Sequence, residues 1–354
     1  MTDISDFLAE KAKSIDERIL KYLPEKFDEK YLEWAFGKAR YAYDVKTLQK
    51  ALSGPIWDFL KRGGKRWRPA MFLLVAEAMG GNIEKMADFV VVPELAHNGS
   101  IMVDDIEDMS EMRRGKPCTH SIYGIDVAIN AGNLMYFLPF LVFIKNRDSF
   151  EKDILIRAYE TFSQEMIIIH LGQAMDIWWH KGNDEGLTEE RYLQMCAYKT
   201  GTLARLSAKL AAILSGGTPE QIEKIGKMAE AIGVGFQIQD DILSASGKEF
   251  MEKKGFGDDI TEGKRTLIVI HAMKTLEPED GKRLKEILNM HTRDPKLMQE
   301  ALDLLKRGGS VEYAREFAKK MVREAWEEAN PIIPDSPAKE KLKSFVDYLI
   351  TRKI

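Results

Sequence analysis

The sequence lacks the features that mark several protein classes. Its two cysteines, Cys118 and Cys196, stand far apart and outside any CxxC spacing, so neither a disulfide framework nor a zinc site is indicated. A reducing, cytoplasmic location fits this cysteine usage best. No Pro/Gly/Ser-rich linker and no internal repeat divides the 354 residues. We therefore expect one large domain over residues 1–354.

A strong excess of one charge and long apolar runs are also missing. Lys and Arg total 52 and Asp and Glu total 56, which gives a net charge of −4 and no indication of a nucleic-acid partner. The longest apolar run, Leu134–Ile144, contains Pro139 and falls well short of the roughly 18–20 residues that cross a bilayer. We expect a buried helix there, with an interfacial segment as the alternative, and no stable membrane insertion. Residues 1–20 are charged throughout, so we expect no secretory signal.

Helical periodicity, in contrast, is abundant. Apolar residues recur at three- and four-residue spacing, as at Leu203, Leu206, Leu210 and Ile213. The β-branched cluster Phe89–Val92 is short and lacks the alternation of a strand. Gly and Pro interrupt the periodicity at points that leave about ten to twelve helices. The sequence therefore predicts an all-α fold.

Two acidic clusters follow apolar helical stretches. The first, Asp104–Asp108, contains four carboxylates, and such crowding at a helix C-terminal end is unfavourable unless a cation binds. Asp104 and Asp108 lie four residues apart on one helix face and could hold one or two hard cations. The second cluster is the pair Asp240–Asp241. A lone Asp-Asp pair is usually a solvated helix end, but two pairs with basic loops beside them favour metal binding.

Basic clusters accompany the acidic ones. The segment Lys61–Pro69 gathers five cations around Gly63 and Gly64, which allow the backbone to approach an anion. Arg113 and Arg114 follow the first acidic cluster. Mg²⁺ would reconcile these charges around a diphosphate, because it binds one or two carboxylates together with phosphate oxygens, and arginine neutralises the rest. A nuclear-localisation or nucleic-acid patch is the alternative, which the acidic composition disfavours.

These residues, in this order, resemble the trans-polyprenyl diphosphate synthases, the farnesyl and geranylgeranyl diphosphate synthase family, from about Asp44 to Ala329. The matching motifs are Gly63–Pro69, Glu94 with His97, Asp104–Asp108, Arg113–Gly115, Gly172–Gln173 with Asp176, Lys199–Thr200, Gln237–Asp241 and Gly257–Thr266. The likeness is greatest to eukaryote-type geranylgeranyl synthases. It implies a helical bundle of the isoprenoid synthase type with a central apolar cavity, in which 1–43 is a helical extension and about 44–329 is the core. Because the family is usually dimeric, it also implies a homodimer.

The resemblance further implies the chemistry and its residues. About three Mg²⁺ ions would help to ionise an allylic diphosphate, whose cation isopentenyl diphosphate then attacks. The ions would be held by Asp104, Asp108 and Asp240, with Asp241 and Asp259 in support. The allylic diphosphate (dimethylallyl, geranyl or farnesyl) would be bound by Arg113, Lys199, Lys254 and Lys264. Isopentenyl diphosphate would be bound by Gly64, Lys65, Arg68, His97 and Arg114, with Phe236 near its carbons. Thr200, Gln173 and Gln237 would direct dipoles toward the developing cation. The implied catalytic residues are Asp104, Asp108, Lys199, Thr200, Gln237 and Asp240.

Small residues before the first acidic cluster bear on product length. In the family, a bulky aromatic on this helix face stops growth at farnesyl diphosphate. Ala96, Gly99 and Ser100 are small, so the resemblance predicts geranylgeranyl diphosphate. Tyr136 or Phe137 could form the floor of the pocket instead, which leaves farnesyl or a longer chain as alternatives.

One position departs from the family pattern. Ser244 stands where the second motif usually has a third aspartate, which implies a weaker or water-mediated metal contact there. A non-catalytic subunit of a heteromeric synthase is therefore an alternative function. A terpene cyclase or a head-to-head coupling enzyme is disfavoured, because neither needs the isopentenyl segment Gly63–Pro69 or Arg114.

Overall fold

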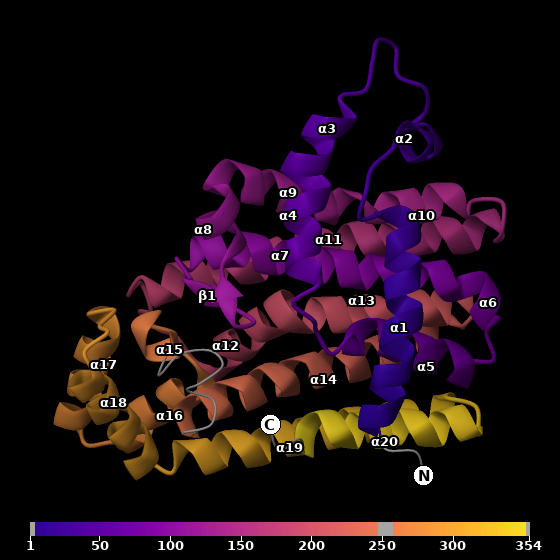
Figure 1. Ribbon diagram of the computed structural model, residues 1–354. Coiled ribbons are helices and arrows are strands. Elements are labelled where there is room, and N and C mark those ends of the chain that lie inside the picture. Colours follow the sequence, from indigo (N-terminus) through magenta and orange to yellow (C-terminus); the bar gives the residue numbers. More distant parts are fainter. Residues whose placement is uncertain (1–3, 247–257, 352–354) are drawn as a thin grey trace. The chain divides into compact units, whose positions relative to one another are not determined.

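The computed structural model describes residues 4–246 and 258–351, which are helical almost throughout (Figure 1). The chain forms two compact units. Unit 1 contains Met1–Phe162, Leu206–Thr218 and Pro334–Leu342, and unit 2 contains Ser163–Arg205, Pro219–Ile333 and Lys343–Ile354. The expectation of one domain over residues 1–354 stays a prediction. The segments of the two units alternate along the chain, so no linker composition marks the division.

The elements that lie wholly within the first unit run from α1 to α10. Its elements are α1 (Ile4–Tyr22), α2 (Glu29–Phe36), α3 (Val45–Leu48), η1 (Gln49–Ser53), α4 (Gly54–Leu60), α5 (Trp67–Ala78), α6 (Ile83–Met86), η2 (Ala87–Val90), α7 (Val91–Glu107), β1 (Met112–Arg113), β2 (Lys116–Pro117), α8 (Thr119–Tyr123), α9 (Ile125–Phe137) and α10 (Pro139–Lys145). The second unit contains α12 (Glu189–Cys196), η3 (Ala197–Gly201), α14 (Pro219–Ser246), α15 (Asp258–Thr261), α16 (Leu267–Thr275), α17 (Pro278–Asn289), α18 (Pro295–Arg307), α19 (Ser310–Ala329) and η5 (Asn330–Ile332). Three helices have residues in both units: α11 (Lys152–His180), α13 (Thr202–Leu214) and α20 (Pro337–Thr351).

The all-α prediction is confirmed, with more helices than expected. Within residues 4–246 and 258–351 there are twenty α-helices and a single two-stranded hairpin. Proline begins or nearly begins α4, α10, α17 and α18, where its missing N–H removes no helical hydrogen bond. Pro139 thus divides one apolar run into α9 and α10, and the sequence interpretation had read that run as one helix.

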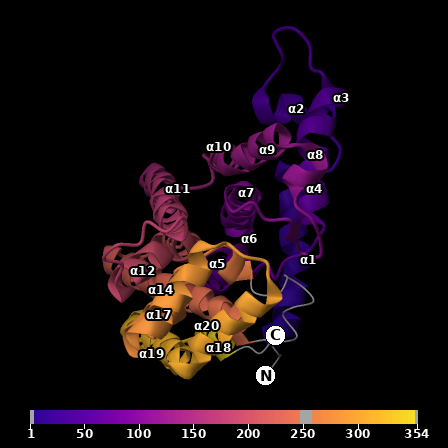
Figure 2. The same cartoon turned by 90° about the vertical axis from the view of Figure 1, so that its left-hand side faces the viewer.

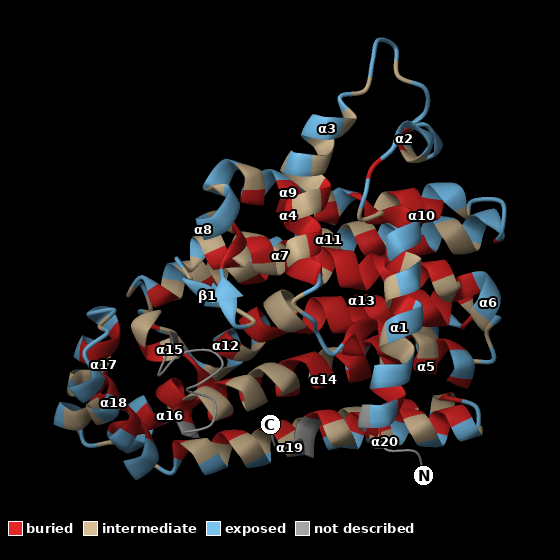
Figure 3. Cartoon of the chain, in the orientation of Figure 1, coloured by how far each residue is buried: buried red, intermediate tan, exposed pale blue. Residues whose placement is uncertain are grey.

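Helix α1 belongs to the core of unit 1. Ile15, Ile19, Tyr22 and Leu23 are almost completely buried, at the spacing of one helix face. Helix α2, in contrast, is mostly exposed (Figure 3). The helical extension expected for residues 1–43 stays a prediction. Figures 1 and 2 both show α2 and α3 at one end of unit 1.

The second unit is built around α14 and α19, which pack along each other in both views (Figures 1 and 2). A second group of helices, α16 to α18, closes an apolar cluster whose buried members include Leu267, Leu284 and Leu305.

The expected helical periodicity is confirmed at Leu203, Leu206, Leu210 and Ile213 of α13, all of which are buried.

Judged by length and composition alone, one stretch of the described residues is long and apolar enough to cross a membrane. It is Ile125–Lys145, with a hydropathy of 1.8 over its most apolar window. Half of that window is buried inside the protein, as in a core helix.

Candidate active site

The first aspartate cluster lies at the C-terminal end of α7, and its members face different environments. Asp104 and Asp108 are half-buried, whereas Asp105 is completely buried. Arg113 donates from Nε and Nη2 to Oδ1 of Asp105, at 2.7 and 2.6 Å. Burial raises the pKa of the Asp105 carboxyl, although Arg113 opposes this effect. Asp105 therefore serves the interior, and Asp104 and Asp108 are the members placed to meet a ligand.

A tight hairpin presents the two arginines that follow. Arg113 pairs with Lys116 across the strands, and Arg114 and Gly115 between them both have positive φ angles of 52° and 74°. Positive φ at both central residues defines a type I′ turn. The left-handed conformation costs a non-glycine residue on the order of 1 kcal/mol, so the fold must hold Arg114 there by other contacts.

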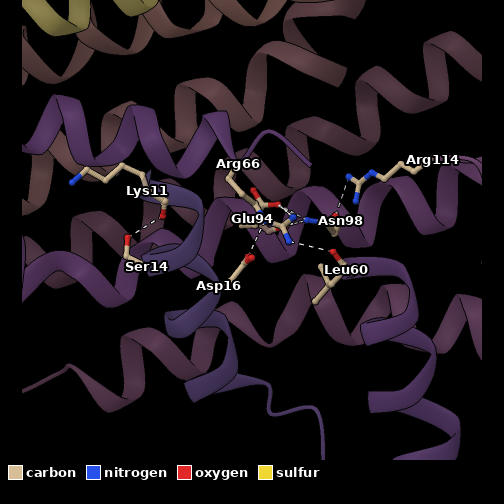
Figure 4. A network of polar contacts seen from close by, with 8 residues as sticks. All are labelled: Lys11, Ser14, Asp16, Leu60, Arg66, Glu94, Asn98 and Arg114. Carbon is tan, nitrogen blue, oxygen red and sulfur yellow. Dashed lines mark hydrogen bonds and ion pairs between the residues drawn. The ribbon is translucent and has the colours of Figure 1, made fainter. Parts of the chain in front are cut away.

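Figure 4 shows those contacts, a buried polar network in unit 1. Glu94 on α7 is 3% exposed and accepts from Nη1 of Arg66 at 2.7 Å and from Nδ2 of Asn98 at 2.7 Å. The carbonyl of Asn98 accepts in turn from Nη2 of Arg114 at 3.3 Å. Nε of Arg66 also donates to Asp16 of α1 at 3.0 Å, so α1 contributes a charge to this network.

The guanidinium of Arg114 has unused hydrogen-bonding capacity. Its Nη1 is buried and has no hydrogen-bond partner among the described residues. Burial lowers the pKa of Arg114 to about 10; Arg66 and Arg113 add to this effect and Glu94 opposes it. A Cβ on Gly64 would lie 3.2 Å from Arg66 Nη1 and 3.4 Å from Arg114 Nη2, so the glycine keeps this space open. An anion would complete the coordination of Arg114.

His97 lies among the same cations. Its Nε2 is 3.1 Å from Nη1 of Arg68, and a guanidinium can only donate, so Nε2 accepts and Nδ1 carries the proton. Burial lowers the pKa of His97 well below its usual value, and the charges of Arg68 and Arg114 lower it further. His97 is therefore neutral, and its Nδ1–H is a hydrogen-bond donor.

The small residues upstream of the cluster have a second explanation. A Cβ on Gly99 would lie 2.8 Å from the carbonyl oxygen of Gly132 and 2.9 Å from Cβ of Met135, both on α9. Gly99 is therefore small because α7 and α9 cross at that point, a reason that the sequence interpretation did not consider. Ala96 is buried and Ser100 is half-buried. Their part in product length stays a prediction, as does that of half-buried Tyr136, whereas Phe137 is 66% exposed and does not suit a pocket floor.

In unit 2, Lys199 and Thr200 lie on η3, a π-helical turn between α12 and α13. Such turns interrupt the regular helix and are frequent at functional sites. The turn η3 is held in place by two glycines on neighbouring helices, which approach its backbone closely. A Cβ on Gly172 would lie too close to the backbone nitrogen of Lys199, and a Cβ on Gly233 would lie 2.7 Å from Cα of Gly201. Nζ of Lys199 forms an ion pair with Asp176 of α11 at 2.5 Å.

The second aspartate pair, on α14, also has one half-buried and one buried member. Asp240 is half-buried, and Asp241 is 4% exposed. Oδ1 of Asp241 accepts from Nε2 of Gln237 at 2.9 Å, and Oδ2 accepts from the hydroxyl of Tyr192 at 2.6 Å. Burial raises the pKa of Asp241 to about 7, with the charge of Asp259 adding to the effect. The hydroxyl of Thr200 donates to Oε1 of Gln237 at 2.9 Å.

The remaining predicted residues of unit 2 surround the loop before α16. Lys264 forms ion pairs with Glu262 and, at 4.0 Å, with Asp259. The loop is held by Arg265, whose Nε donates to Asp184 at 2.7 Å. A small cavity of about 20 Å³, enough for one water, is lined on its polar side by Asp241, Ser244, Asp259 and Lys264.

Other predicted residues are placed as follows. Lys65 and Gly64 are exposed, Arg68 is buried, and Gln173 and Phe236 are half-buried. Lys254 lies outside the described residues. The predicted residues of unit 1 and those of unit 2 each gather within their own unit. Whether both sets act on one substrate stays a prediction.

Sequence reasoning missed several residues that orient the site. Glu94 was noted as part of a motif but given no role, and Asn98, Tyr192 and Asp184 were passed over. The available signal was polar character on an otherwise apolar helix face, since Glu94 and Asn98 lie one turn apart on the buried side of α7.

An all-helical fold with two Asp-Asp pairs, each beside cationic side chains, defines the class of helical isoprenoid synthases. The sequence model described as Polyprenyl synthetase matches residues 49–305. The short chain isoprenyl diphosphate synthase of Methanothermobacter thermautotrophicus is 34% identical over 324 residues, which cover 92% of this chain and 97% of that protein. The geranylgeranyl pyrophosphate synthase of Geoglobus acetivorans is 34% identical over 350 residues, which cover 99% of each.

A solved structure agrees with these sequence matches. The crystal structure of geranylgeranyl pyrophosphate synthetase from Pyrococcus horikoshii has a TM-score of 0.84 and 32% identity, and 99% of each chain is covered. The chain belongs to the polyprenyl synthetase family and is a prenyltransferase. A Dictyostelium discoideum geranylgeranyl pyrophosphate synthase is 33% identical over 78% of this chain. Archaeal and eukaryotic relatives therefore match about equally, which gives no preference to the eukaryote-type branch.

Proposed function

We propose that this prenyltransferase condenses isopentenyl diphosphate with an allylic diphosphate and releases geranylgeranyl diphosphate as its main product. The observation that carries the proposal is a buried pair of cations, Arg68 and Arg114, with the neutral His97 beside Arg68. In this group, Nη1 of Arg114 has no hydrogen-bond partner among the described residues. Buried cations need anionic partners, and a diphosphate supplies several acceptor oxygens.

The residues of this chain also fit Mg²⁺, which we propose as the cofactor, with about three ions per site. No group of three or more His, Cys, Asp or Glu side chains that could hold a metal alone is found in the described part of the chain. Mg²⁺ needs no such group, because it takes one or two carboxylates and completes its shell with phosphate oxygens and water. Asp104 and Asp108 in unit 1 and Asp240 in unit 2 are the half-buried carboxylates that would hold it. When bound, Mg²⁺ would neutralise charge on the departing diphosphate.

The chain's own residues then divide the remaining work. Arg113, Lys199 and Lys264 would bind the allylic diphosphate. Lys199 would have to share its ammonium between Asp176 and this substrate. Oxygens of Thr200 and Gln237 would face the positive charge that develops on the allylic carbon. The released diphosphate would accept the proton that leaves, because its anionic oxygens are basic enough to take it.

Product length is supported by the relatives, several of which are named geranylgeranyl synthases, including that of Methanosarcina mazei at 33% identity. Ala96 and Ser100 are the small residues that would leave room for the chain. Replacing half-buried Ser100 by Tyr should shorten the product, and an unchanged product would remove Ser100 from this role. The Gly99→Tyr exchange is a poor test, because it would first force α7 and α9 apart.

The central experiment incubates the purified chain with Mg²⁺, labelled isopentenyl diphosphate and, separately, dimethylallyl, geranyl and farnesyl diphosphate. Dephosphorylated products are then sized. Arg114→Gln should raise the KM for isopentenyl diphosphate by roughly tenfold or more, through loss of a charge-assisted hydrogen bond. Arg283→Gln, which removes an exposed arginine paired with Glu300, is the matched control. No incorporation of label with any starter would refute the proposal.

We also propose a cytoplasmic homodimer. Large apolar side chains are exposed along α9, α10 and the part of α11 that lies in unit 1, namely Ile129, Phe137, Ile144 and Ile156. A dimer interface would bury these side chains, whereas a monomer would leave them in water. Phe137→Glu should shift the mass measured by light scattering toward that of a monomer, and Phe36→Glu on α2 should not. The cytoplasmic location is supported by Cys118 and Cys196, which are buried free thiols.

A further inference from the structure

We infer that Tyr192 and Asp241 are positioning residues, which fix the side-chain amide of Gln237 so that its oxygen and that of Thr200 face the allylic cation. The inference rests on the proposed function and deepens it. It replaces the metal-supporting role predicted for Asp241 with an orienting role, and it gives Tyr192 a role for the first time.

The contacts form one unbroken chain within unit 2. Tyr192 of α12 donates to Oδ2 of Asp241 at 2.6 Å, and Nε2 of Gln237 donates to Oδ1 at 2.9 Å. Thr200 of η3 donates to Oε1 of Gln237 at 2.9 Å. Tyr192 is 2% exposed and Asp241 is 4% exposed, so water is excluded from the bond between them, whereas Gln237 and Thr200 are half-buried. The two helices concerned, α12 and α14, both belong to unit 2.

This chain specifies which end of the amide points where. A flipped Gln237 would bring its carbonyl oxygen against a carboxylate oxygen of Asp241, which is repulsive, and would lose the acceptor for Thr200. Gln237 alone, four residues before Asp241 on α14, could turn either way. Tyr192 prevents Asp241 from rotating by binding its second oxygen. The orientation of the Gln237 amide is therefore decided by Tyr192, which acts through Asp241.

The orientation matters for charge. The proton of the Thr200 hydroxyl is directed at Gln237, so the lone pairs of Thr200 point elsewhere, and the carbonyl of Gln237 carries the negative end of its dipole. The side-chain oxygens of Thr200 and Gln237 are thereby fixed before the reaction begins, with their partial negative charges turned toward the proposed position of the allylic cation. Dipoles that are already oriented stabilise a developing charge without a cost of reorganisation. The buried pair Tyr192–Asp241 would therefore affect the rate of ionisation more than substrate binding.

The first test is Tyr192→Phe. We expect kcat to fall by roughly 10- to 100-fold, the range for partners that orient catalytic groups, with both KM values changed by less than about threefold. Tyr313→Phe is the matched control, because its hydroxyl donates to a carboxylate of Glu189 at 2.7 Å in the same unit. The control should retain wild-type kcat. An equal loss in both variants, or no loss in Tyr192→Phe, would overturn the inference.

Two further variants separate orientation from other roles. In a Gln237→Ala background, Tyr192→Phe should have no additional effect on kcat, because the group that it orients is gone. Asp241→Asn can still accept from Gln237 and donate to Tyr192, so it should lose about tenfold less activity than Asp241→Leu. Equal losses for Asn and Leu would show that Asp241 acts through its charge, as a metal-supporting residue would. Melting temperatures confirm that each variant folds. A wild type without turnover would refute the proposed function instead, before any variant is compared.

Discussion

The two aspartate pairs are alike in position but differ in what their buried member binds. In unit 1, Asp105 is completely buried against Arg113, a cation. In unit 2, Asp241 is buried against a phenol and an amide, which are neutral donors. In each pair the preceding aspartate, Asp104 or Asp240, stays half-buried. Adjacent residues on a helix point about 100° apart, so one aspartate can meet a ligand while the next serves the interior.

The difference in partners indicates a difference in purpose. A cation partner compensates a buried carboxylate electrostatically, and in exchange the carboxylate fixes the guanidinium of Arg113. Neutral donors compensate less charge but fix both oxygens in direction. The first pair therefore positions a charge near the residues of unit 1 that we propose to bind diphosphate, and the second positions a dipole. The predictions below test this contrast.

The largest effect should follow from the half-buried members. Asp104→Ala should lower kcat by roughly 10²- to 10³-fold or more, because it removes electrostatic stabilisation in the ionisation step. Glu107→Ala is the control, since Glu107 is an exposed carboxylate of the same cluster. Steady-state kinetics at saturating Mg²⁺ measures both. Similar losses in the two variants would mean that the total charge of the Asp104–Asp108 cluster matters and that the position of each carboxylate does not.

The buried members should lose different amounts of stability when their charge is removed. Asp105→Asn leaves Arg113 without a counterion and should lower the free energy of unfolding by about 2 kcal/mol. Asp241→Asn keeps its two hydrogen bonds and should cost less than about 1 kcal/mol. Urea denaturation compares the two variants. Equal costs would contradict the distinction between cation and neutral partners.

Glycine contacts hold the helix that carries each pair, and this similarity can be tested too. Gly99 of α7 meets Gly132, and Gly233 of α14 meets Gly201, with a Cβ in each case closer than 3.0 Å to its neighbour. Gly99→Ala and Gly233→Ala should each lower the free energy of unfolding by about 1–2 kcal/mol through overpacking. Gly281→Ala, where a Cβ meets nothing closer than 3.9 Å, should be neutral or slightly stabilising. If Gly281→Ala destabilises as much, helix crossing is not the cause.

The sequence predicted the helical class because it depends on local patterns. The same kind of pattern singled out the aspartate clusters, whose role in metal binding stays a prediction. Apolar spacing marks helix faces, and four carboxylates in one cluster are costly without a cation. The partners of Asp105 and Asp241 were not predictable in the same way. Tyr192 lies 49 positions before Asp241, and only the packing of α12 on α14 brings them together. The same applies to Gly99, whose small size reads equally as pocket or as helix crossing until its neighbour Gly132 is known.

The smallest expected effect concerns a third buried carboxylate, Asp88 of η2, which extends the contrast to pH. Burial raises the pKa of Asp88, but hydrogen bonds from Lys21 and Tyr22 and the charge of Arg18 outweigh burial, so its pKa lies below the ordinary value of 3.8. A lowered pKa means that Asp88 stabilises unit 1 above about pH 4 and that this contribution is lost as pH falls through the folded-state pKa.

Asp88→Asn should therefore cost about 1 kcal/mol at pH 7, a modest amount because Arg18 and Lys21 are partly solvated. The difference from wild type should shrink as pH falls below about 4 and through the folded-state pKa of Asp88, as measured by urea denaturation down to about pH 2. A difference that stays constant down to pH 2 would mean that Asp88 stabilises α1 by shape and hydrogen bonding alone. In that case the cations on α1 would not compensate Asp88 in the way that Arg113 compensates Asp105.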